Sequence, residues 1–303
     1  MLKLGLDWTP NVNHIGFFVA QAKGFYKDHK LKVAISNPLD DDYTVTPAKK
    51  IELGLLDFAL CPMESIISFR TKEKPFPLTA IACLLQDDLS AIAVRSDMGI
   101  NSPKDLDGKT YASYKARYED GIVKAMVEND GGNGNLNIIY PEKLGIWNTV
   151  MEGECDATWI FLNWEGVAAK DSPIPLKYFK MADFQIPYSY SPVIAANADK
   201  MAENLDAYQN FLSATKKGFL YAQEHPAESI EILRPHVPVY DEHIDLMDAL
   251  EMTIPFFGSS KDWGRIKPAN ITTFLHWLNE KGLEKQPIRP EDIATQNCFE
   301  ENE

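Results

Sequence analysis

The stretch LDWTPNVNH, residues 6–14, connects the first strand-like segment of the chain to its first helical segment. Residues 3–7, at its start, have the short apolar pattern of a strand, and residues 16–28, after it, have the spacing of an amphipathic helix. The same alternation continues with strand-like residues 31–35, helical residues 46–53 and a buried-strand run at 57–60. Strands that alternate with helices predict an α/β fold with a mainly parallel sheet.

Several side chains of this stretch suit ligand binding. They are an aromatic ring, two amides and an imidazole, from Trp8, Asn11, Asn13 and His14. All lie just beyond the carboxyl end of the predicted strand, where open α/β sheets bind ligands. The alternative is structural, with Trp8 in the core and the asparagines in a turn, because Asn is common in turns. Trp8, Asn11 and His14 are therefore candidate ligand contacts, and both interpretations stay open at this point.

A second α/β pattern begins near residue 90. It runs through a helical turn at 102–106, strands at 108–113, 136–140 and 157–161, and helices at 119–128 and 147–152. Residues 172–187 contain several prolines and are expected to form a loop. From residue 202 onward the pattern is helical, over residues 205–222, 227–234, 242–253 and 272–281. We expect these last helices to pack on the first lobe.

The composition narrows the class of protein. With 303 residues and 45% hydrophobic residues, the chain is long enough for two cores. Its formal net charge of -14 disfavours nucleic acid and anionic membrane surfaces as partners. No apolar run approaches the ~20 residues that cross a bilayer, so no membrane insertion is expected. The four cysteines are scattered, which predicts buried thiols and neither a metal site nor a disulfide framework.

The segment LDWTPNVNHIGFFVAQAKGFYKDHKLKV, residues 6–33, resembles the opening of the ThiY-like binding proteins, which deliver thiamine pyrimidine precursors. The resemblance extends over nearly the whole chain. It implies a type II periplasmic-binding-protein-like fold, with two α/β lobes joined by a two-segment hinge and a ligand cleft between them. Lobe one would comprise residues 1–90 plus 191–303 and lobe two residues 91–190, with crossings near 88–92 and 188–193. A small aromatic heterocycle and an ABC transporter permease are the partners that the family implies.

A second motif supports the same resemblance. The run WIFLNWEG, residues 159–166, is similar to the xWNWEG run of the pyrimidine-binding members. An aminopyrimidine offers a flat face on which an aromatic ring stacks and a donor edge that a carboxylate binds. We expect Glu165 to take that edge, with Asn163 and Trp164 beside it. The alternatives are a helix-first-turn role for Glu165 and a core position for Trp164.

Further candidate ligand contacts lie in loops after the other predicted strands and at the second crossing. They are Tyr43, Cys61, Glu64, Tyr114, Tyr118 and Tyr188. A role in surface or hinge packing is equally open for each, because loops position many residues that bind nothing.

An enzyme is the main alternative to a binding protein. The fold family includes a eukaryotic-type synthase that makes the pyrimidine phosphate from pyridoxal phosphate and its own histidine. The resemblance places Cys61 at its lysine position, Ser65 at its histidine position and the cysteine-free residues 188–194 at its cysteine-rich run. We therefore predict a binder without catalytic residues, metal or cofactor. A binder of riboflavin or a sulfonate is a third alternative.

The chain opens directly on a strand-like segment and not on a secretory leader. This predicts a cytoplasmic protein if Met1 is the natural start, and a periplasmic or extracellular one if a leader has been removed.

Overall fold

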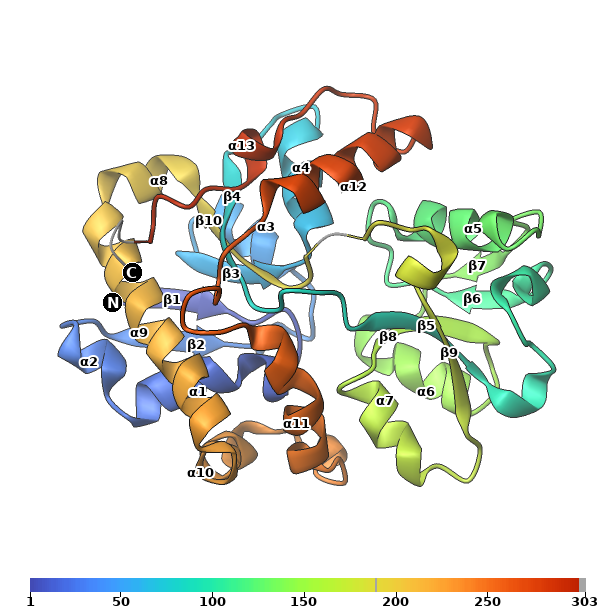
Figure 1. The fold of residues 1–303 in the computed structure, drawn as a ribbon, viewed down its shortest axis with the longest axis horizontal. Coiled ribbons are helices and arrows are strands. Elements are labelled where there is room, and N and C mark those ends of the chain that lie inside the picture. Colours follow the sequence, from blue (N-terminus) through green and yellow to red (C-terminus); the bar gives the residue numbers. More distant parts are fainter. Residues whose placement is uncertain (189, 300–303) are drawn as a thin grey trace. The chain divides into compact units, whose positions relative to one another are not determined.

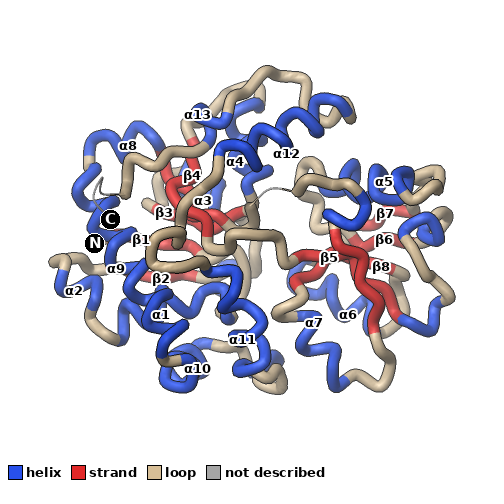
Figure 2. The backbone as a smooth tube through the Cα atoms, viewed as in Figure 1, coloured by secondary structure: helices blue, strands red, loops and turns tan. Residues whose placement is uncertain are grey.

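The chain forms two compact units in a computed structural model that describes residues 1–188 and 190–299. Unit 1 comprises Met1–Asp88, Ser189–Pro268 and Ile288–Glu303, and unit 2 comprises Leu89–Tyr188 and Ala269–Pro287. Each unit contains one five-stranded sheet with helices around it, which Figure 2 marks by secondary structure. The two sheets confirm the predicted α/β class.

The sheet of unit 1 has the strand order β2-β1-β3-β10-β4. Its strands are β1 (Leu2–Gly5), β2 (Val33–Ser36), β3 (Phe58–Cys61), β4 (Leu78–Cys83) and β10 (Val193–Asn197). β1 runs parallel to both β2 and β3, whereas β10 runs antiparallel to β3 and β4. The carboxyl ends of β1, β2 and β3 therefore meet at one edge of the sheet, and the loops that follow them gather there.

The helices of unit 1 pack around this sheet. They are α1 (Ile15–Ala22), α2 (Phe25–Asp28), α3 (Pro47–Glu52), α4 (Met63–Thr71), α8 (Ala198–Glu203), α9 (Leu205–Glu224), α10 (Pro226–Leu233), α11 (Leu246–Phe257) and α13 (Pro290–Ile293). The long helix α9 crosses α1 in Figure 1, and the two helices pack tightly together. A Cβ atom added at Gly218 would collide with the Gly16 carbonyl oxygen, so this approach of two backbones requires glycine.

The sheet of unit 2 has the order β7-β6-β8-β5-β9. Its strands are β5 (Ser90–Arg95), β6 (Thr110–Ala112), β7 (Asn137–Ile139), β8 (Ala157–Phe161) and β9 (Leu176–Lys180). β6 is parallel to β7 and β8, and β5 is antiparallel to β8 and β9. The longer helices are α5 (Glu119–Asn129), α6 (Ile146–Met151), α7 (Glu165–Ala168) and α12 (Pro268–Glu280).

One expected loop is a strand. The prolines of residues 172–187 predict a loop, yet β9 (Leu176–Lys180) lies within them and pairs with β5. β9 is at the edge of the sheet, and Pro173 and Pro175 both precede it, so no proline interrupts its hydrogen bonds. The loop prediction for these five residues was wrong because proline was taken to exclude a strand that it only flanks.

The helix α12 also differs from expectation, because Ala269–Pro287 belong to unit 2 and not with residues 191–303 of the first lobe. Phe274 contacts the edge of the Tyr188 ring, with centroids 5.6 Å apart. The Tyr118 hydroxyl donates to Glu284 at 2.6 Å. An amphipathic pattern shows that a helix has an apolar face but not which unit covers that face. The expected crossing at residues 188–193 includes Ser189, which lies outside the described residues.

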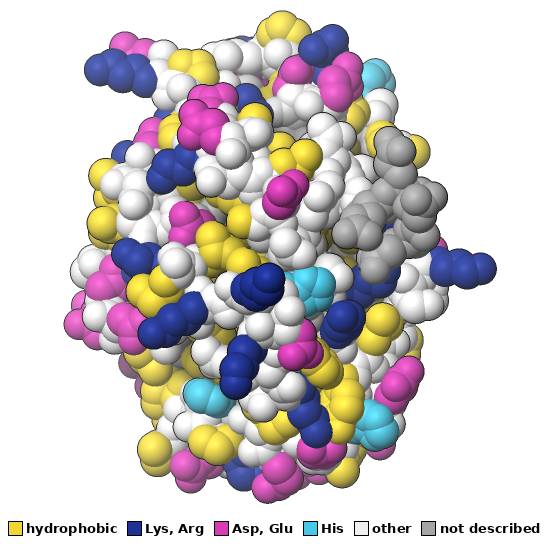
Figure 3. Space-filling view, turned by 90° about the vertical axis from the view of Figure 1, so that its left-hand side faces the viewer, with side chains coloured by type: hydrophobic (Ala, Val, Ile, Leu, Met, Phe, Trp, Pro, Cys, Tyr) yellow, Lys and Arg dark blue, Asp and Glu magenta, His cyan; other side chains and the backbone are white. Residues whose placement is uncertain are grey.

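The surface is less uniformly acidic than the net charge suggests. Figure 3 shows a face of the molecule on which Lys and Arg side chains gather among hydrophobic ones, with Asp and Glu around them. None of the helices in the described ranges combines the length and the apolar character that a membrane span requires.

Substitution Gly218→Ala tests the α1–α9 contact. The added methyl group would meet the backbone of Gly16 and the Ala20 side chain, so we expect the free energy of unfolding to fall by about 1–3 kcal/mol in urea denaturation. Gly145→Ala is the matched control, because a Cβ atom at Gly145 meets nothing within 4 Å. Equal stability of the two variants would contradict the tight contact.

Candidate functional site

Three loops of unit 1 meet at the carboxyl-end edge of its sheet, and each carries a residue proposed from the sequence. The loop after β1 carries Trp8, the loop after β2 carries Tyr43, and β3 ends at Cys61 just before α4. The electrostatics of these residues agree with this grouping, because, besides burial, the charge of Asp7 raises the pKa of both Tyr43 and Cys61. We call Asp7, Trp8, Tyr43, Cys61 and Glu64 the unit 1 cluster.

A buried histidine, His14, holds the Asp7 carboxylate of this cluster in place. His14 is 1% exposed, and its Nε2 lies 2.9 Å from Asp7 Oδ1. The backbone N–H of Asn11 donates to His14 Nδ1 at 3.2 Å, so Nδ1 is an acceptor and the proton is on Nε2. His14 therefore donates to Asp7, whose side chain keeps 19% of its surface exposed. The arrangement makes His14 a positioning residue behind an accessible carboxylate.

Asn11 holds the turn that brings these two residues together. Its Oδ1 accepts from the backbone N–H of Asn13 at 2.9 Å, and its Nδ2 donates to the Thr9 carbonyl at 3.0 Å. These bonds cap the short helix Val12–His14. Both polar ends of the Asn11 side chain are thus engaged in the turn, which favours the structural interpretation for this residue.

The aromatic part of the cluster is a perpendicular pair. The Trp8 and Tyr43 rings lie edge to face, with centroids 5.9 Å apart and planes at 69°. Burial and the charges of Asp7 and its neighbours raise the pKa of the Tyr43 hydroxyl, which keeps it neutral. Trp8, the residue after Asp7, is half-buried, so part of its surface stays exposed.

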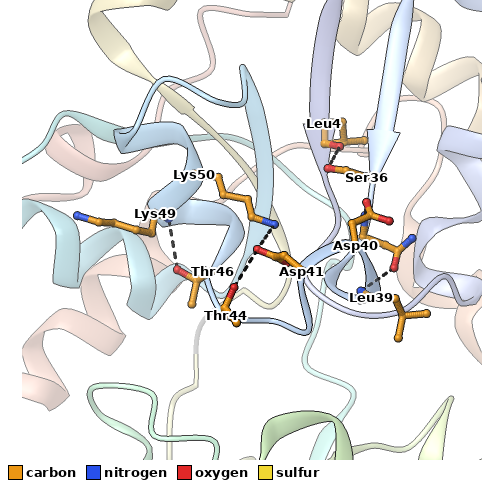
Figure 4. Close-up of polar contacts among 10 residues, drawn as sticks. Leu4, Ser36, Leu39, Asp40, Asp41, Thr44, Thr46, Lys49 and Lys50 are labelled. Carbon is orange, nitrogen blue, oxygen red and sulfur yellow. Dashed lines mark hydrogen bonds and ion pairs between the residues drawn. The ribbon is translucent and has the colours of Figure 1, made fainter.

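Polar contacts hold the loop that carries Tyr43 in place (Figure 4). Lys50 of α3 forms an ion pair with Asp41 at 2.9 Å, and Thr44 donates to the same carboxylate at 3.4 Å. Thr46 caps α3 by accepting from the Lys49 backbone. These contacts join the loop to the helix that follows, so Tyr43 has a fixed place opposite Trp8.

The third loop supplies a buried acid and a buried thiol. Glu64 is 6% exposed in the first turn of α4, where the helix dipole favours an acidic side chain. Cys61 is 4% exposed, and burial together with the charges of Asp7 and Glu64 raises the pKa of its thiol well above the ordinary range. Cys61 is therefore uncharged, and its surroundings are acidic.

The candidates of unit 2 fall into two groups by exposure. Tyr118, Asn163 and Trp164 are at most 3% exposed and belong to the interior. Tyr118 donates to Glu284, and its ring lies under the Arg117 guanidinium at 5.0 Å. Burial favours the core interpretation for Trp164 and a structural role for Tyr118.

The other candidates of unit 2 are half-buried, so part of each side chain is accessible to a ligand. They are Tyr114, Glu165 and Tyr188. Tyr188 lies edge to face with Trp159, with centroids 5.0 Å apart. Glu165 Oε2 accepts from the Phe161 backbone N–H at 2.9 Å, so part of its hydrogen-bonding capacity closes the turn after β8. Because β6 and β8 are parallel neighbours, the loops that carry Tyr114 and Glu165 follow the same edge of the sheet.

Sequence reasoning missed two acids of unit 1. Asp7 was read as the end of a strand, although an acid before Trp8 with a histidine seven residues later is a signal that could have found it. Asp241, in the short helix Val239–Asp241, lies close enough to Thr9 for Thr9 to affect its pKa, which burial raises to about 6. No pattern in the sequence connects Asp241 with the first loop.

Within residues 1–188 and 190–299, no group of three or more His, Cys, Asp and Glu side chains is arranged to hold a metal ion.

Comparisons with known proteins agree with this fold. The model of the NMT1/THI5-like family matches residues 11–229. The formylaminopyrimidine-binding protein of Halalkalibacterium halodurans is 24% identical over 303 aligned positions, which cover 95% of this chain and 87% of that protein. The 4-amino-5-hydroxymethyl-2-methylpyrimidine phosphate synthase of Legionella pneumophila is also 24% identical, over 86% of this chain and 83% of the synthase.

A solved structure gives the same architecture. The Candida albicans CA3427 gene product, which exhibits the generic periplasmic binding protein fold, superimposes with a TM-score of 0.73 at 16% identity, covering 100% of this chain and 98% of that one. The family resemblance and the two-lobed periplasmic-binding-protein-like fold predicted from the sequence are thereby confirmed.

The raised pKa of Asp241 predicts a pH-dependent contribution to stability. Between about pH 4 and 6 the folded chain holds a proton that the unfolded chain has released, so this group makes the free energy of unfolding fall as pH rises through that window. Asp241→Asn removes the effect. We expect this variant to gain stability over the wild type from pH 4 to pH 7, by at most about 3 kcal/mol at ~1.4 kcal/mol per pKa unit.

Thermal or urea denaturation at a series of pH values measures this difference. Glu242→Gln, at the exposed neighbouring position, controls for the loss of one surface charge. A difference between Asp241→Asn and wild type that does not change with pH would contradict the assignment.

Proposed function

Since the chain belongs to the NMT1/THI5-like family, we propose that it is a substrate-binding protein for an aminopyrimidine precursor of thiamine, serving an ABC-type uptake or salvage system. The observation that carries this proposal is the Asp7 carboxylate, which His14 holds in place next to the Trp8 and Tyr43 rings. The ligand in the name of the Halalkalibacterium halodurans relative supports the same class of compound.

The chemistry of an aminopyrimidine fits the unit 1 cluster. Its flat ring has a π face suited to contact with Trp8, and its amino group and ring nitrogens form a donor-bearing edge. His14 donates to Asp7 Oδ1, so we assign Asp7 Oδ2 as the acceptor for the donor-bearing edge of the ligand. A carboxylate that accepts from an amino group forms a charge-assisted hydrogen bond, which is about twice as strong as a neutral one.

The charge of the cluster separates this ligand from a sulfonate. Asp7 and Glu64 both act on Cys61, so two carboxylates lie near one point of the sheet edge. An anionic sulfonate would approach like charges there, which is unfavourable, whereas a donor-bearing heterocycle gains from them. A flavin also carries a flat ring and N–H donors, so this charge argument does not separate it from an aminopyrimidine.

The synthase is the second candidate function, because a synthase is among the relatives of similar identity. It needs a lysine to hold pyridoxal phosphate, and the family resemblance places Cys61 at that position. Cys61 is buried and its thiol is neutral, so it does not supply a lysine's amine chemistry. This favours a binder over the synthase.

Isothermal titration of the whole chain with formylaminopyrimidine and with 4-amino-5-hydroxymethyl-2-methylpyrimidine tests the proposal. We expect saturable binding to one site and a ligand-dependent rise in melting temperature, with ligand and protein masses unchanged afterwards. A mass loss from a histidine after incubation with pyridoxal phosphate and iron would establish the synthase instead. If neither pyrimidine binds, the proposal is overturned.

Variants of the Asp7–His14 pair test its role in affinity. Asp7→Asn removes the charged acceptor, and we expect the Kd to rise roughly 10- to 100-fold, in keeping with about 1.5–3 kcal/mol for a hydrogen bond to a charged group. Asp42→Asn, at an exposed position of the loop after β2, is the matched control and should leave the Kd unchanged.

Two substitutions at His14 separate positioning from packing. His14→Asn keeps an acceptor for the Asn11 backbone but loses the donor to Asp7, so the Kd should rise. His14→Gln keeps a donor that reaches Asp7 and should restore most of the affinity. Equal affinity of these two variants would show that His14 does not act through Asp7.

A further inference from the structure

The segment between α10 and α11 packs on the part of unit 1 that carries Trp8. His236, near the start of this segment, stacks on the Phe18 ring of α1 with ring centroids 4.3 Å apart. At the other end, α11 packs on the short helix Val12–His14. Figure 1 shows α10 and α11 beside α1. Residues 237–245 connect these two contacts, and the binding proposal makes no use of them.

Thr9, the residue after Trp8, has a buried hydroxyl group. The residue is 1% exposed, and within residues 1–188 and 190–299 its Oγ1 has no hydrogen-bond partner. Burial of an unpaired hydroxyl destabilises a folded chain, because water hydrogen-bonds to the group in the unfolded chain. Native proteins keep few such groups, so the Thr9 hydroxyl requires a physical explanation.

Two residues of the α10–α11 segment lie beside this hydroxyl. Burial raises the pKa of Tyr240 and of Asp241, and Thr9 lies close enough to both to lower each pKa. The charge that lowers the pKa of Asp241 is that of His243, an exposed side chain, and no Lys or Arg of the described residues contributes. Asp241 is thus a partly buried acid next to a buried hydroxyl.

The same segment exposes apolar surface. Val239 and Tyr240 are both more than half exposed. An aromatic ring with accessible surface can pack against a flat ligand. Beside the Thr9 hydroxyl, the segment therefore offers an acceptor, the Asp241 carboxyl group, and an aromatic surface, the Tyr240 ring.

This group lies within reach of a ligand that binds Asp7. Asp7 and Thr9 flank Trp8 in the chain, so their α carbons are at most about 7 Å apart. This distance is comparable with the length of an aminopyrimidine and one substituent. A ligand whose donor edge binds Asp7 can therefore place its substituent at Thr9 without leaving unit 1.

A formamide substituent matches the groups found there. Its carbonyl oxygen can accept from the Thr9 hydroxyl, and its N–H can donate to Asp241. A hydroxymethyl group can do both through a single oxygen, and a methyl group can do neither. The ligand in the name of the Halalkalibacterium halodurans relative carries a formyl group.

We propose that Thr9 and Asp241 form a subsite of unit 1 that recognises the polar substituent of the pyrimidine and takes a formamide best. The inference rests on the proposed function for the ring and adds the class of substituent. The folded chain keeps the Thr9 hydroxyl unpaired, at a cost in stability, because the ligand supplies its partner.

The first measurement compares two ligands by isothermal titration. They are formylaminopyrimidine and 4-amino-2,5-dimethylpyrimidine, which has the ring but no polar substituent. Thr9→Val removes the hydroxyl at nearly constant volume, and we expect the Kd for formylaminopyrimidine to rise roughly 3- to 10-fold, in keeping with one neutral hydrogen bond. The Kd for the dimethyl compound should not change. Thr9→Ser keeps the hydroxyl and should bind both ligands as wild type does.

Asp241→Ala tests the second group of the subsite. It removes the acceptor for the substituent N–H, so the Kd for formylaminopyrimidine should rise and that for the dimethyl compound should not. The double variant Thr9→Val/Asp241→Ala should lose less affinity than the sum of the two single losses, because both residues bind the same substituent.

The second measurement is the melting temperature without ligand. Thr9→Val should melt at or above the temperature of wild type, because it removes an unpaired buried hydroxyl. Ser229→Ala is the matched control for both measurements. Ser229 in α10 is also fully buried, and its Oγ has no partner among the described residues, so this variant should keep its stability and leave every Kd unchanged.

An unchanged Kd of Thr9→Val for formylaminopyrimidine would overturn the inference and leave the proposed function intact, and it is the result expected if solvent alone meets this hydroxyl. Equal losses for the two ligands, or a melting temperature of Thr9→Val below that of wild type, would also overturn it. If wild type binds neither compound, the proposed function fails and the inference fails with it. Should Thr9→Val not fold, Thr9→Ala gives the same comparison with Thr9→Ser.

Discussion

The hydrogen bond from buried His14 to Asp7 is the constraint on which the proposed binding surface depends. It connects the end of β1 with the start of α1, and the Asn11 turn fixes the tautomer by donating to the other ring nitrogen. A carboxylate at a sheet edge ordinarily has several rotamers and is well hydrated. Because His14 holds one oxygen in place, less conformational entropy is lost when a ligand binds the other.

Much of the fold could be predicted from the sequence because it rests on local periodicity. Alternating strand and helix patterns give the α/β class, and the motif at residues 6–14 gives the family. The strand β9 and the unit to which α12 belongs could not be predicted in this way, since both depend on pairing or packing with segments far away in the chain.

The candidate site was predictable to a smaller degree. Trp8 and Tyr43 were found because aromatic residues after strand ends are conspicuous, and the structure brings their rings together. Asp7 was missed as a candidate group, because an acid at the end of a strand is ordinary in sequence. Its proposed role depends on a donor that only the structure reveals, the buried His14 side chain.

The most direct test of the central claim is an NMR measurement of the His14 imidazole nitrogens, without ligand and with saturating formylaminopyrimidine. The account predicts that Nε2 carries the proton in both states and that its resonance shifts when ligand is added, because Asp7 then shares its charge with a second donor. A proton on Nδ1, or a spectrum that does not change at saturation, would contradict the assignment of Asp7 as the carboxylate that His14 presents to the ligand.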